Sequence, residues 1–150
     1  MKKQPRTKLL VENKRARYDY QILESYEAGL ALRGYEVKAI KTGHVSLKGS
    51  YVVIKNNEAY LINAFIPPYQ PANTPKEYNP KRSRKLLLKQ SEIKALIGKS
   101  KQKGLTLIPL KLYTKRGKVK LEFGTGKGKR KQDKREEIKK REAEREIRGR

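Results

Sequence analysis

The apolar residues of this chain occur in short segments separated by turn residues, and this spacing constrains the fold class most strongly. Residues 50–55 (SYVVIK) and 58–66 (EAYLINAFI) flank Asn56 and Asn57. Residues 105–113 (LTLIPLKLY) and 118–123 (KVKLEF) flank a TKRG turn. Short apolar segments around such turns are typical of β-hairpins. The sequence therefore predicts two hairpins, and Pro109 indicates an edge or a bulge within the first strand of the second one.

Further short elements are predicted along the chain. Period-two alternation over residues 18–23 predicts a strand, and residues 35–41 (YEVKAIK) and 45–47 (VSL) are also expected to be strands. In residues 26–34 (YEAGLALRG), a preceding Ser25 and a final Gly34 predict a short helix. A longer helix is expected from about Leu86 or Ser91 to Lys103.

About seven short strands with few helices predict a mainly β protein. The expected fold is an OB-like closed β-barrel with two or three short helices over residues 13–124, an architecture common among nucleic-acid binders. Residues 1–12 are expected to be a flexible N-terminus. Residues 125–150 are expected to form a flexible Gly/Lys linker and a C-terminal tail, because the composition changes abruptly after Phe123. The connection 67–85 holds five of the seven prolines, and loops of this length are usually functional or disordered.

The charge of the chain indicates a polyanionic partner. Lys and Arg total 39 against 15 Asp and Glu, a net charge of +24, whereas solubility needs a magnitude of only about 2–8. Nucleic acids and anionic membranes are the common polyanions. No stretch approaches the roughly 20 apolar residues of a membrane span, and no signal peptide is apparent. The sequence therefore predicts a cytoplasmic nucleic-acid binder with no membrane partner.

Enzymatic chemistry has little support in the sequence. Cysteine is absent, and the single histidine, His44, lies in a turn-like TGHVS segment, where a surface or capping role is more common than catalysis. No metal-ligand cluster or Ser/His/Asp set can be assembled. The segment GTGKGK lacks the strand-to-helix context and the Ser/Thr ending of a phosphate-binding loop. We therefore expect neither catalysis nor a cofactor or metal.

Glu27 is an unusual acidic residue in a basic chain, and two explanations remain open. Its carboxylate could offset a helix dipole, which is worth about 0.3–1 kcal/mol. Alternatively, it could accept hydrogen bonds from base edges or ribose hydroxyls, as recognition of unpaired RNA requires.

Three basic clusters could hold phosphates. They are NKRAR (13–17), KRSRK (81–85) and KGKRK (127–131). Tyr18, Tyr20 and Tyr78 lie near them in the sequence, as stacking rings beside phosphate clamps would. The spacing of Tyr18 and Tyr20 fits the core better than stacking.

Five segments together resemble small protein B, the SsrA (tmRNA)-binding protein family of bacteria. They are NKRARYDYQILESYEAGLALRGYEVK (13–38), SYVVI (50–54), RKLLL (84–88), KGLTLIPLKLY (103–113) and GKRKQDKRE (128–136). The resemblance implies an OB-like barrel that binds the tRNA-like domain of tmRNA. With elongation factor Tu, the protein would deliver tmRNA to the stalled 70S ribosome, where trans-translation tags the nascent peptide for degradation.

The resemblance also implies two groups of functional residues. The expected RNA-binding residues are Asn13, Lys14, Arg15, Glu27, Ala28, Gly29, Arg84, Lys85, Leu87 and Lys89. The expected ribosome-binding residues of the tail are Gly128, Lys129, Gln132, Asp133, Lys134, Arg135 and Ile138.

The tail is expected to become a helix only on its partner. Its three Glu-to-basic pairs at i,i+4, such as Glu136 and Lys140, each favour a helix by about 0.2–0.5 kcal/mol. The three pairs together contribute about 1 kcal/mol, which does not offset the unfavourable nucleation of so short a helix, whose constant is of order 10⁻³. The resemblance implies that the tail orders in the mRNA channel near the decoding centre, and a monomer is expected. The alternative is a ribosomal protein or another structural component that binds rRNA.

Overall fold

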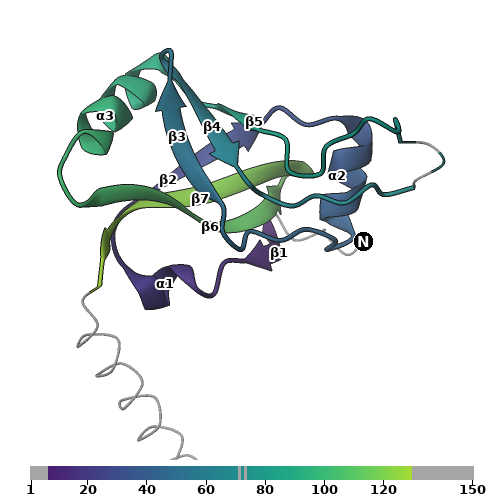
Figure 1. The fold of residues 1–150 in the computed structure, drawn as a ribbon, viewed down its shortest axis with the longest axis horizontal. Helices are drawn as coiled ribbons and strands as arrows, with labels where there is room; N and C mark the ends of the chain where they lie inside the picture. Colours follow the sequence, from purple (N-terminus) through teal and green to yellow (C-terminus); the bar gives the residue numbers. More distant parts are fainter. Residues whose placement is uncertain (1–6, 71, 73, 130–150) are drawn as a thin grey trace, which may run out of the picture.

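The computed structural model describes residues 7–70, 72 and 74–129. These residues form seven strands and three helices (Figure 1). The strands are β1 (Thr7–Glu12), β2 (Tyr20–Leu30), β3 (Tyr51–Lys55), β4 (Glu58–Ile62), β5 (Arg84–Leu87), β6 (Leu105–Lys115) and β7 (Lys118–Gly128). The helices are α1 (Ala16–Asp19), α2 (Gly34–Lys41) and α3 (Gln90–Ser100). The mainly β class predicted from the sequence is confirmed.

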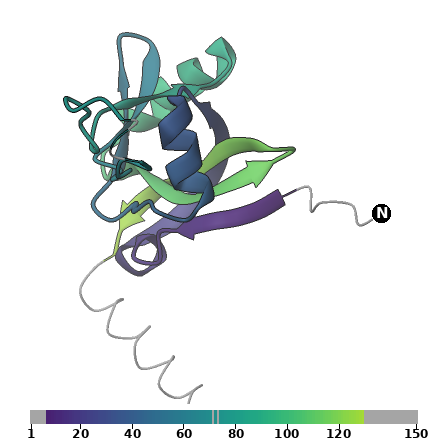
Figure 2. The same ribbon diagram turned by 90° about the vertical axis from the view of Figure 1, so that its right-hand side faces the viewer.

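All seven strands belong to one antiparallel sheet in the order β1-β6-β3-β4-β5-β2-β7. β6 also pairs with β7, so the pairings from β6 through β3, β4, β5, β2 and β7 return to β6. The sheet is strongly curved, and α2 and α3 lie at opposite ends of it (Figures 1 and 2).

Both predicted hairpins are confirmed, with turns of the expected chemistry. Asn56 and Asn57 join β3 to β4 with φ angles of 52° and 60°, the left-handed pair that a two-residue hairpin turn needs. Arg116 and Gly117, with φ of 53° and 79°, join β6 to β7. The pairing register shifts between Pro109 and Lys111, so the bulge that Pro109 indicated is also confirmed.

Two adjacent predictions near the N-terminus are wrong, because strand and helix are exchanged. Residues 26–30 were expected to begin a helix, but they belong to β2, where residues 26–29 pair with β7 and Leu30 pairs with β5. Residues 35–41 were expected to be a strand, but they lie in α2. In α2 the buried residues are Glu36, Ala39 and Ile40, which have the i, i+3, i+4 spacing of a helix face. Within residues 45–47, Ser46 forms only an isolated bridge with Phe65.

The ordered sheet extends beyond the boundaries predicted at both ends. Residues 7–12, expected to be flexible, form β1, and Leu10 and Val11 pack against the main core. Residues 125–128, expected to be linker, complete β7 between β2 and β6. A Cβ atom on Gly124 would lie 2.6 Å from the Glu24 carbonyl oxygen. Glycine at this position therefore permits close strand approach and does not indicate a linker.

The main core packs on the inner face of the curved sheet. A smaller cluster packs on the outer face of β6. Phe123, Leu121 and Leu61 are among the fully buried residues of the main core. In the smaller cluster, Ala16 of α1 packs against Ile108 and Leu110. α1 is therefore fixed to the outer side of β6, beside the end of β7 (Figure 1).

Candidate nucleic-acid interface

An open groove of about 620 Å³ brings together five of the predicted RNA-binding residues. They are Glu27 and Gly29 of β2, Lys85 and Leu87 of β5, and Lys89 just before α3. Lys120 of β7 lines the same groove. Glu58 and Glu92 also line it, so the groove combines carboxylates, an exposed leucine and several ammonium groups, the side-chain types that contact RNA bases, sugars and phosphates.

The close pairing of β2 with β5 shapes this groove. Gly29 lies opposite Leu87, and a Cβ atom on Gly29 would come within 3.3 Å of the Leu87 Cβ atom. Leu87 is 54% exposed, whereas Ala28 is buried and belongs to the core. Ala28 therefore fixes the backbone of β2, and Leu87 provides an apolar surface in the groove.

The carboxylate of Glu27 lies in a strand, so a helix dipole does not explain it. The Tyr113 hydroxyl donates a hydrogen bond to its Oε2 atom, and the Nζ atom of Lys115 lies 3.5 Å from its Oε1 atom. The pKa of Glu27 is lowered, mainly by the Tyr113 hydrogen bond. Burial opposes this effect to a smaller extent, and the charges of Lys115 and Lys120 lower the pKa further. Glu27 is therefore ionised and can only accept hydrogen bonds.

Of the groove lysines, Lys85 and Lys89 are exposed and Lys120 is half-buried. The Nζ atom of Lys85 lies 2.8 Å from Glu58, and this ion pair is the main influence that raises the pKa of Lys85. The backbone N–H of Lys89 donates to Oε1 of Glu92 at 3.1 Å at the start of α3. The Lys85 side chain can turn toward a phosphate, since an exposed ion pair of this kind is weak, and the Lys89 contact involves only its backbone.

Three predicted RNA-binding residues lie apart from the groove, around the start of α1. The Asn13 amide donates to the Pro109 carbonyl at 2.9 Å, and the exposed Lys14 follows it. Arg15 pairs with Asp19 at 3.1 Å, and its guanidinium lies 4.8 Å from the centre of the Tyr18 ring. The structure thus divides the predicted interface into the groove and this second area, which we call the α1 corner (residues 13–19).

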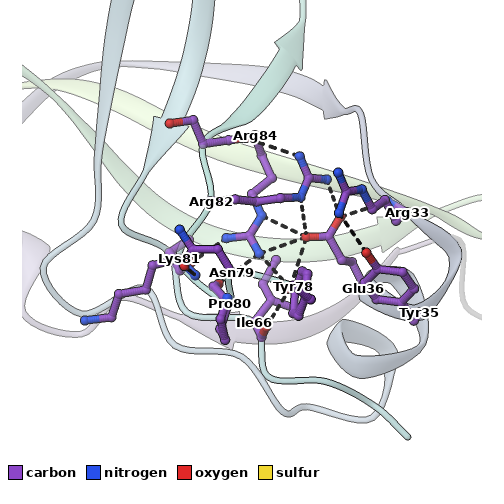
Figure 3. A network of polar contacts seen from close by, with 12 residues as sticks. Arg33, Tyr35, Glu36, Ile66, Tyr78, Asn79, Pro80, Lys81, Arg82 and Arg84 are labelled. Atoms are coloured by element: carbon purple, nitrogen blue, oxygen red, sulfur yellow. Dashed lines mark hydrogen bonds and ion pairs between the residues drawn. The ribbon is translucent and has the colours of Figure 1, made fainter. Parts of the chain in front are cut away.

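Arg84 does not occupy the position of a phosphate ligand. Its side chain is fully buried, and its Nε and Nη2 atoms donate to Glu36 of α2 at 3.0 and 2.8 Å. Its Nη1 atom donates to the Ala64 carbonyl at 2.6 Å, and Nη2 also donates to Tyr78 (Figure 3). The prediction that Arg84 binds RNA is therefore wrong in this conformation, because each nitrogen of its guanidinium is engaged inside the protein.

Glu36 is the centre of this buried network. It also accepts hydrogen bonds from Arg82 and, at 2.9 Å, from the backbone N–H of Arg33 (Figure 3). Burial would raise the pKa of Glu36, but the hydrogen bonds from Arg82, Arg33 and Arg84 together lower it. The network joins α2 to the segment that leads into β5, so it positions Lys85 and Leu87 indirectly.

The described residues give little support for catalysis or membrane insertion. Among them, no cluster of three or more His, Asp or Glu side chains could hold a metal ion. His44 is exposed, and its Nδ1 atom lies 2.8 Å from the Thr42 hydroxyl. No helix in the described part of the chain has the length and apolar character needed to span a membrane.

Comparison with known protein families identifies the chain. The model of the SmpB protein family matches residues 10–150. The chain belongs to the SmpB family. The resemblance noted in the sequence is thereby confirmed.

Curated relatives and a solved structure agree with this assignment. The chain is 51% identical to the SsrA-binding protein of Nostoc punctiforme over 140 residues, which are 93% of this chain and 90% of the relative. It has the same identity and coverage with the SsrA-binding protein of Geobacillus thermodenitrificans. A chain of the solved structure "tmRNA-SmpB: a journey to the center of the bacterial ribosome" is 46% identical, with a TM-score of 0.67. That match covers 85% of this chain and 93% of the other.

Two of the tail residues expected from the SmpB family lie at the end of the sheet. Gly128 closes β7 opposite Tyr20. The backbone N–H of Lys129 donates to the Asp19 carbonyl at 2.9 Å, and its Nζ atom donates to the Arg17 carbonyl at 2.7 Å. Both residues therefore adjoin the α1 corner. The other predicted tail residues, Gln132, Asp133, Lys134, Arg135 and Ile138, lie outside the described residues.

Lys120 is a basic groove residue that the prediction for this SmpB chain omitted. Its signal was present in the alternation of KVKLEF, where Val119, Leu121 and Phe123 are buried and the residues between them face outward. Which outward residue would reach Glu27 depends on the pairing of β7 with β2, because Gly29 lies opposite Lys120. The sequence does not specify that register.

Proposed function

We propose that this SmpB-family chain binds the tRNA-like domain of tmRNA (SsrA) and delivers it to stalled ribosomes for trans-translation. The observation that carries the proposal is the groove, where Glu27 and Leu87 lie among lysines of three different segments. Family membership and the relatives named SsrA-binding proteins support the choice of tmRNA as the ligand.

The groove suits an unpaired region of folded RNA. A carboxylate accepts hydrogen bonds from base amino or imino groups and from ribose 2′-hydroxyls, and such groups are accessible where bases are unpaired. Leu87 offers an apolar contact to a base face, while Lys85, Lys89 and Lys120 can neutralise phosphates. An acidic residue would weaken non-specific binding to a phosphate backbone, so Glu27 contributes selectivity.

The α1 corner provides a second contact for the same RNA. Lys14 is exposed and Arg15 lies over the Tyr18 ring, so both cations are available to phosphates at the side of the protein. Asn13 orients this turn through its hydrogen bond to Pro109. Lys14 and Arg15 therefore contribute affinity that depends on salt.

The remaining parts of the proposal follow from the family and the topology. The circuit of strand pairings supports an OB-like closed barrel, and the chain acts as a non-enzymatic, monomeric, cytoplasmic adaptor that works with elongation factor Tu. Residues 130–150 form the ribosome-binding tail, which orders as a helix in the mRNA channel of the small subunit. Asp133, Lys134 and Arg135 belong to this tail.

Recovery of bound RNA tests the proposal. The tagged full chain is purified from a bacterial lysate, and the RNA that it retains is sequenced. Strong enrichment of tmRNA is expected. Uniform recovery of rRNA without tmRNA would contradict the proposal and would favour the alternative of a ribosomal protein.

A substitution tests the groove itself. Replacing Glu27 by Gln keeps the size of the side chain and removes its charge, so we expect weaker binding of the tRNA-like domain by about tenfold, a typical value for a hydrogen bond to a charged group. Gel-shift titration measures the affinity, and thermal unfolding checks that the variant is folded. A folded variant with wild-type affinity would remove Glu27 from the interface.

A further inference from the structure

The hydroxyl group of Tyr113 holds the Glu27 carboxylate from a strand that does not line the groove. Tyr113 belongs to β6, which is separated from β2 by β7. Its side chain is only 6% exposed, so the ring is fixed by packing, and its hydroxyl donates to Oε2 of Glu27. Glu27 itself is 40% exposed, and its side chain also borders the groove.

The local charges explain why Glu27 needs this support. Glu122 of β7 lies directly opposite Glu27 in the strand pairing, and like charges at such positions repel. Lys111 pairs with Glu122 at 3.3 Å, while Lys115 reaches Glu27 only at 3.5 Å. The hydroxyl of Tyr113 is therefore the closest donor that holds Glu27 in place. Burial, followed by the hydrogen bond to Glu27, raises the pKa of Tyr113, so its proton remains available for donation.

We infer that Tyr113 is a positioning residue for RNA binding, whose hydroxyl fixes the Glu27 carboxylate so that its free lone pairs meet hydrogen-bond donors of the RNA. This inference rests on the proposed function and adds a residue that is not among those lining the groove. A half-exposed glutamate without this bond would sample several rotamers and would lose that freedom on binding. By holding Glu27 in one rotamer in the free protein, the hydroxyl reduces the conformational entropy that the side chain loses on binding RNA.

A double-mutant cycle tests the inference on the full chain, with the transcribed tRNA-like domain of tmRNA as the probe. Tyr113→Phe keeps the buried ring and removes the hydroxyl, and we expect it to weaken binding by about tenfold. In a Glu27→Ala background the same change should have no further effect, since no carboxylate remains to be held. Thermal unfolding of each variant confirms that it is folded.

Tyr26→Phe is the matched control. The Tyr26 hydroxyl also donates to a carboxylate, Oε2 of Glu24 at 2.6 Å on the same strand, but Glu24 does not line the groove. We expect this variant to bind the RNA with wild-type affinity. A loss equal to that of Tyr113→Phe would overturn the inference, because any tyrosine–carboxylate bond on β2 would then matter equally.

The remaining outcomes separate the inference from the proposed function. If Glu27→Ala weakens binding but Tyr113→Phe does not, Glu27 remains in the interface and the inference fails. If Tyr113→Phe costs the same with and without Glu27, Tyr113 has a general structural role and the inference fails. If Glu27→Ala binds with wild-type affinity, the role of Glu27 in the proposed interface fails together with the inference.

Discussion

Glu27 and Lys120 bring opposite charges to the groove. Glu27 is held by Tyr113 and accepts hydrogen bonds, whereas Lys120, from the neighbouring strand, supplies positive charge. Lys120 also helps to lower the pKa of Glu27. The two residues thus hold opposite charges near each other, and in the proposed interface each would contribute differently to RNA binding.

Replacing Lys120 by Gln should weaken binding of the tRNA-like domain and reduce its dependence on salt. One phosphate contact contributes about 0.7–0.9 to the slope of log affinity against log salt concentration. Titrations at several salt concentrations measure this slope. Lys103→Gln, at an exposed site after α3, is the matched control and should leave the slope unchanged. Equal slopes in both variants would place the RNA phosphates elsewhere.

At the scale of elements, the network around Glu36 joins α2 to β5. Replacing Glu36 by Gln leaves the buried Arg84 without its counter-charge, so we expect the free energy of unfolding to fall by about 3–5 kcal/mol. Urea denaturation measures this change. Glu77→Gln, at an exposed position, should have no such effect. A wild-type stability of the Glu36 variant would mean that Arg84 finds another partner.

The same network predicts how stability depends on pH. The pKa of Glu36 is lowered in the folded state, so its contribution is present above the ordinary glutamate pKa and is lost as the pH falls through the lowered value. The Glu36→Gln variant lacks this group and should lose less stability on acidification than the wild type. Denaturation at a series of acidic pH values checks the difference.

A second prediction for an element concerns the glycines of β7. Gly124→Ala would place Cβ against the backbone oxygen of Glu24, which cannot move without shifting β2, so we expect a loss of about 1–3 kcal/mol. Gly128→Ala has open space around it and serves as the control. Equal stability of the two variants would show that β2 and β7 can separate at this point without cost.

The elements also show what the sequence could and could not predict. The hairpins were predicted correctly because Asn56, Asn57 and Gly117 are residue types that favour the positive φ angles of these turns. Residues 26–34 were assigned to a helix because Ser25 and Gly34 match the ends of one, but the pairing of residues 26–29 with β7 overrides that local signal. The end of β7 was missed because its glycines, some of which close strand packing requires, make the segment look like a Gly-rich linker in the sequence.

The candidate site was predicted only where the residue type or the family resemblance indicates the role. Glu27 and Lys85 were found from charge, and the resemblance supplied Leu87 and Gly29. Arg84 was misassigned because its partner, Glu36, is 48 residues away in the sequence. Lys120 and Tyr113 were missed because both depend on the register between β2, β7 and β6. Long-range pairing of this kind is not visible in local patterns.

At the scale of the whole molecule, the structure defines where the tail can be removed. Truncation after Lys129 preserves β7 and its contacts with α1, so the described fold should remain intact. Residues 130–150 contain ten basic and six acidic side chains, so the truncated chain keeps a net charge of +20. We expect it to bind the tRNA-like domain with little loss and to fail in peptide tagging on stalled ribosomes.

Gel shifts and a tagging assay on stalled ribosomes check this prediction. Replacing Asp133, Lys134 and Arg135 together by Ala should give the same separation of binding from tagging. Continued tagging by the truncated chain would make the tail dispensable. Complete loss of RNA binding would instead make the tail part of the RNA interface.

β7 connects the groove to the edge of the sheet beside α1 and keeps the two at a fixed distance. Lys120 lies in the groove, and Lys129, nine residues later, contacts α1 where the described chain ends. At about 3.3 Å per residue, the path along the chain between them is at most about 30 Å. Because β7 is paired on both sides, with β2 and with β6, it resists bending over this length. It is therefore a rigid spacer: RNA bound in the proposed groove would be kept at a constant separation from the end of β7 beside α1.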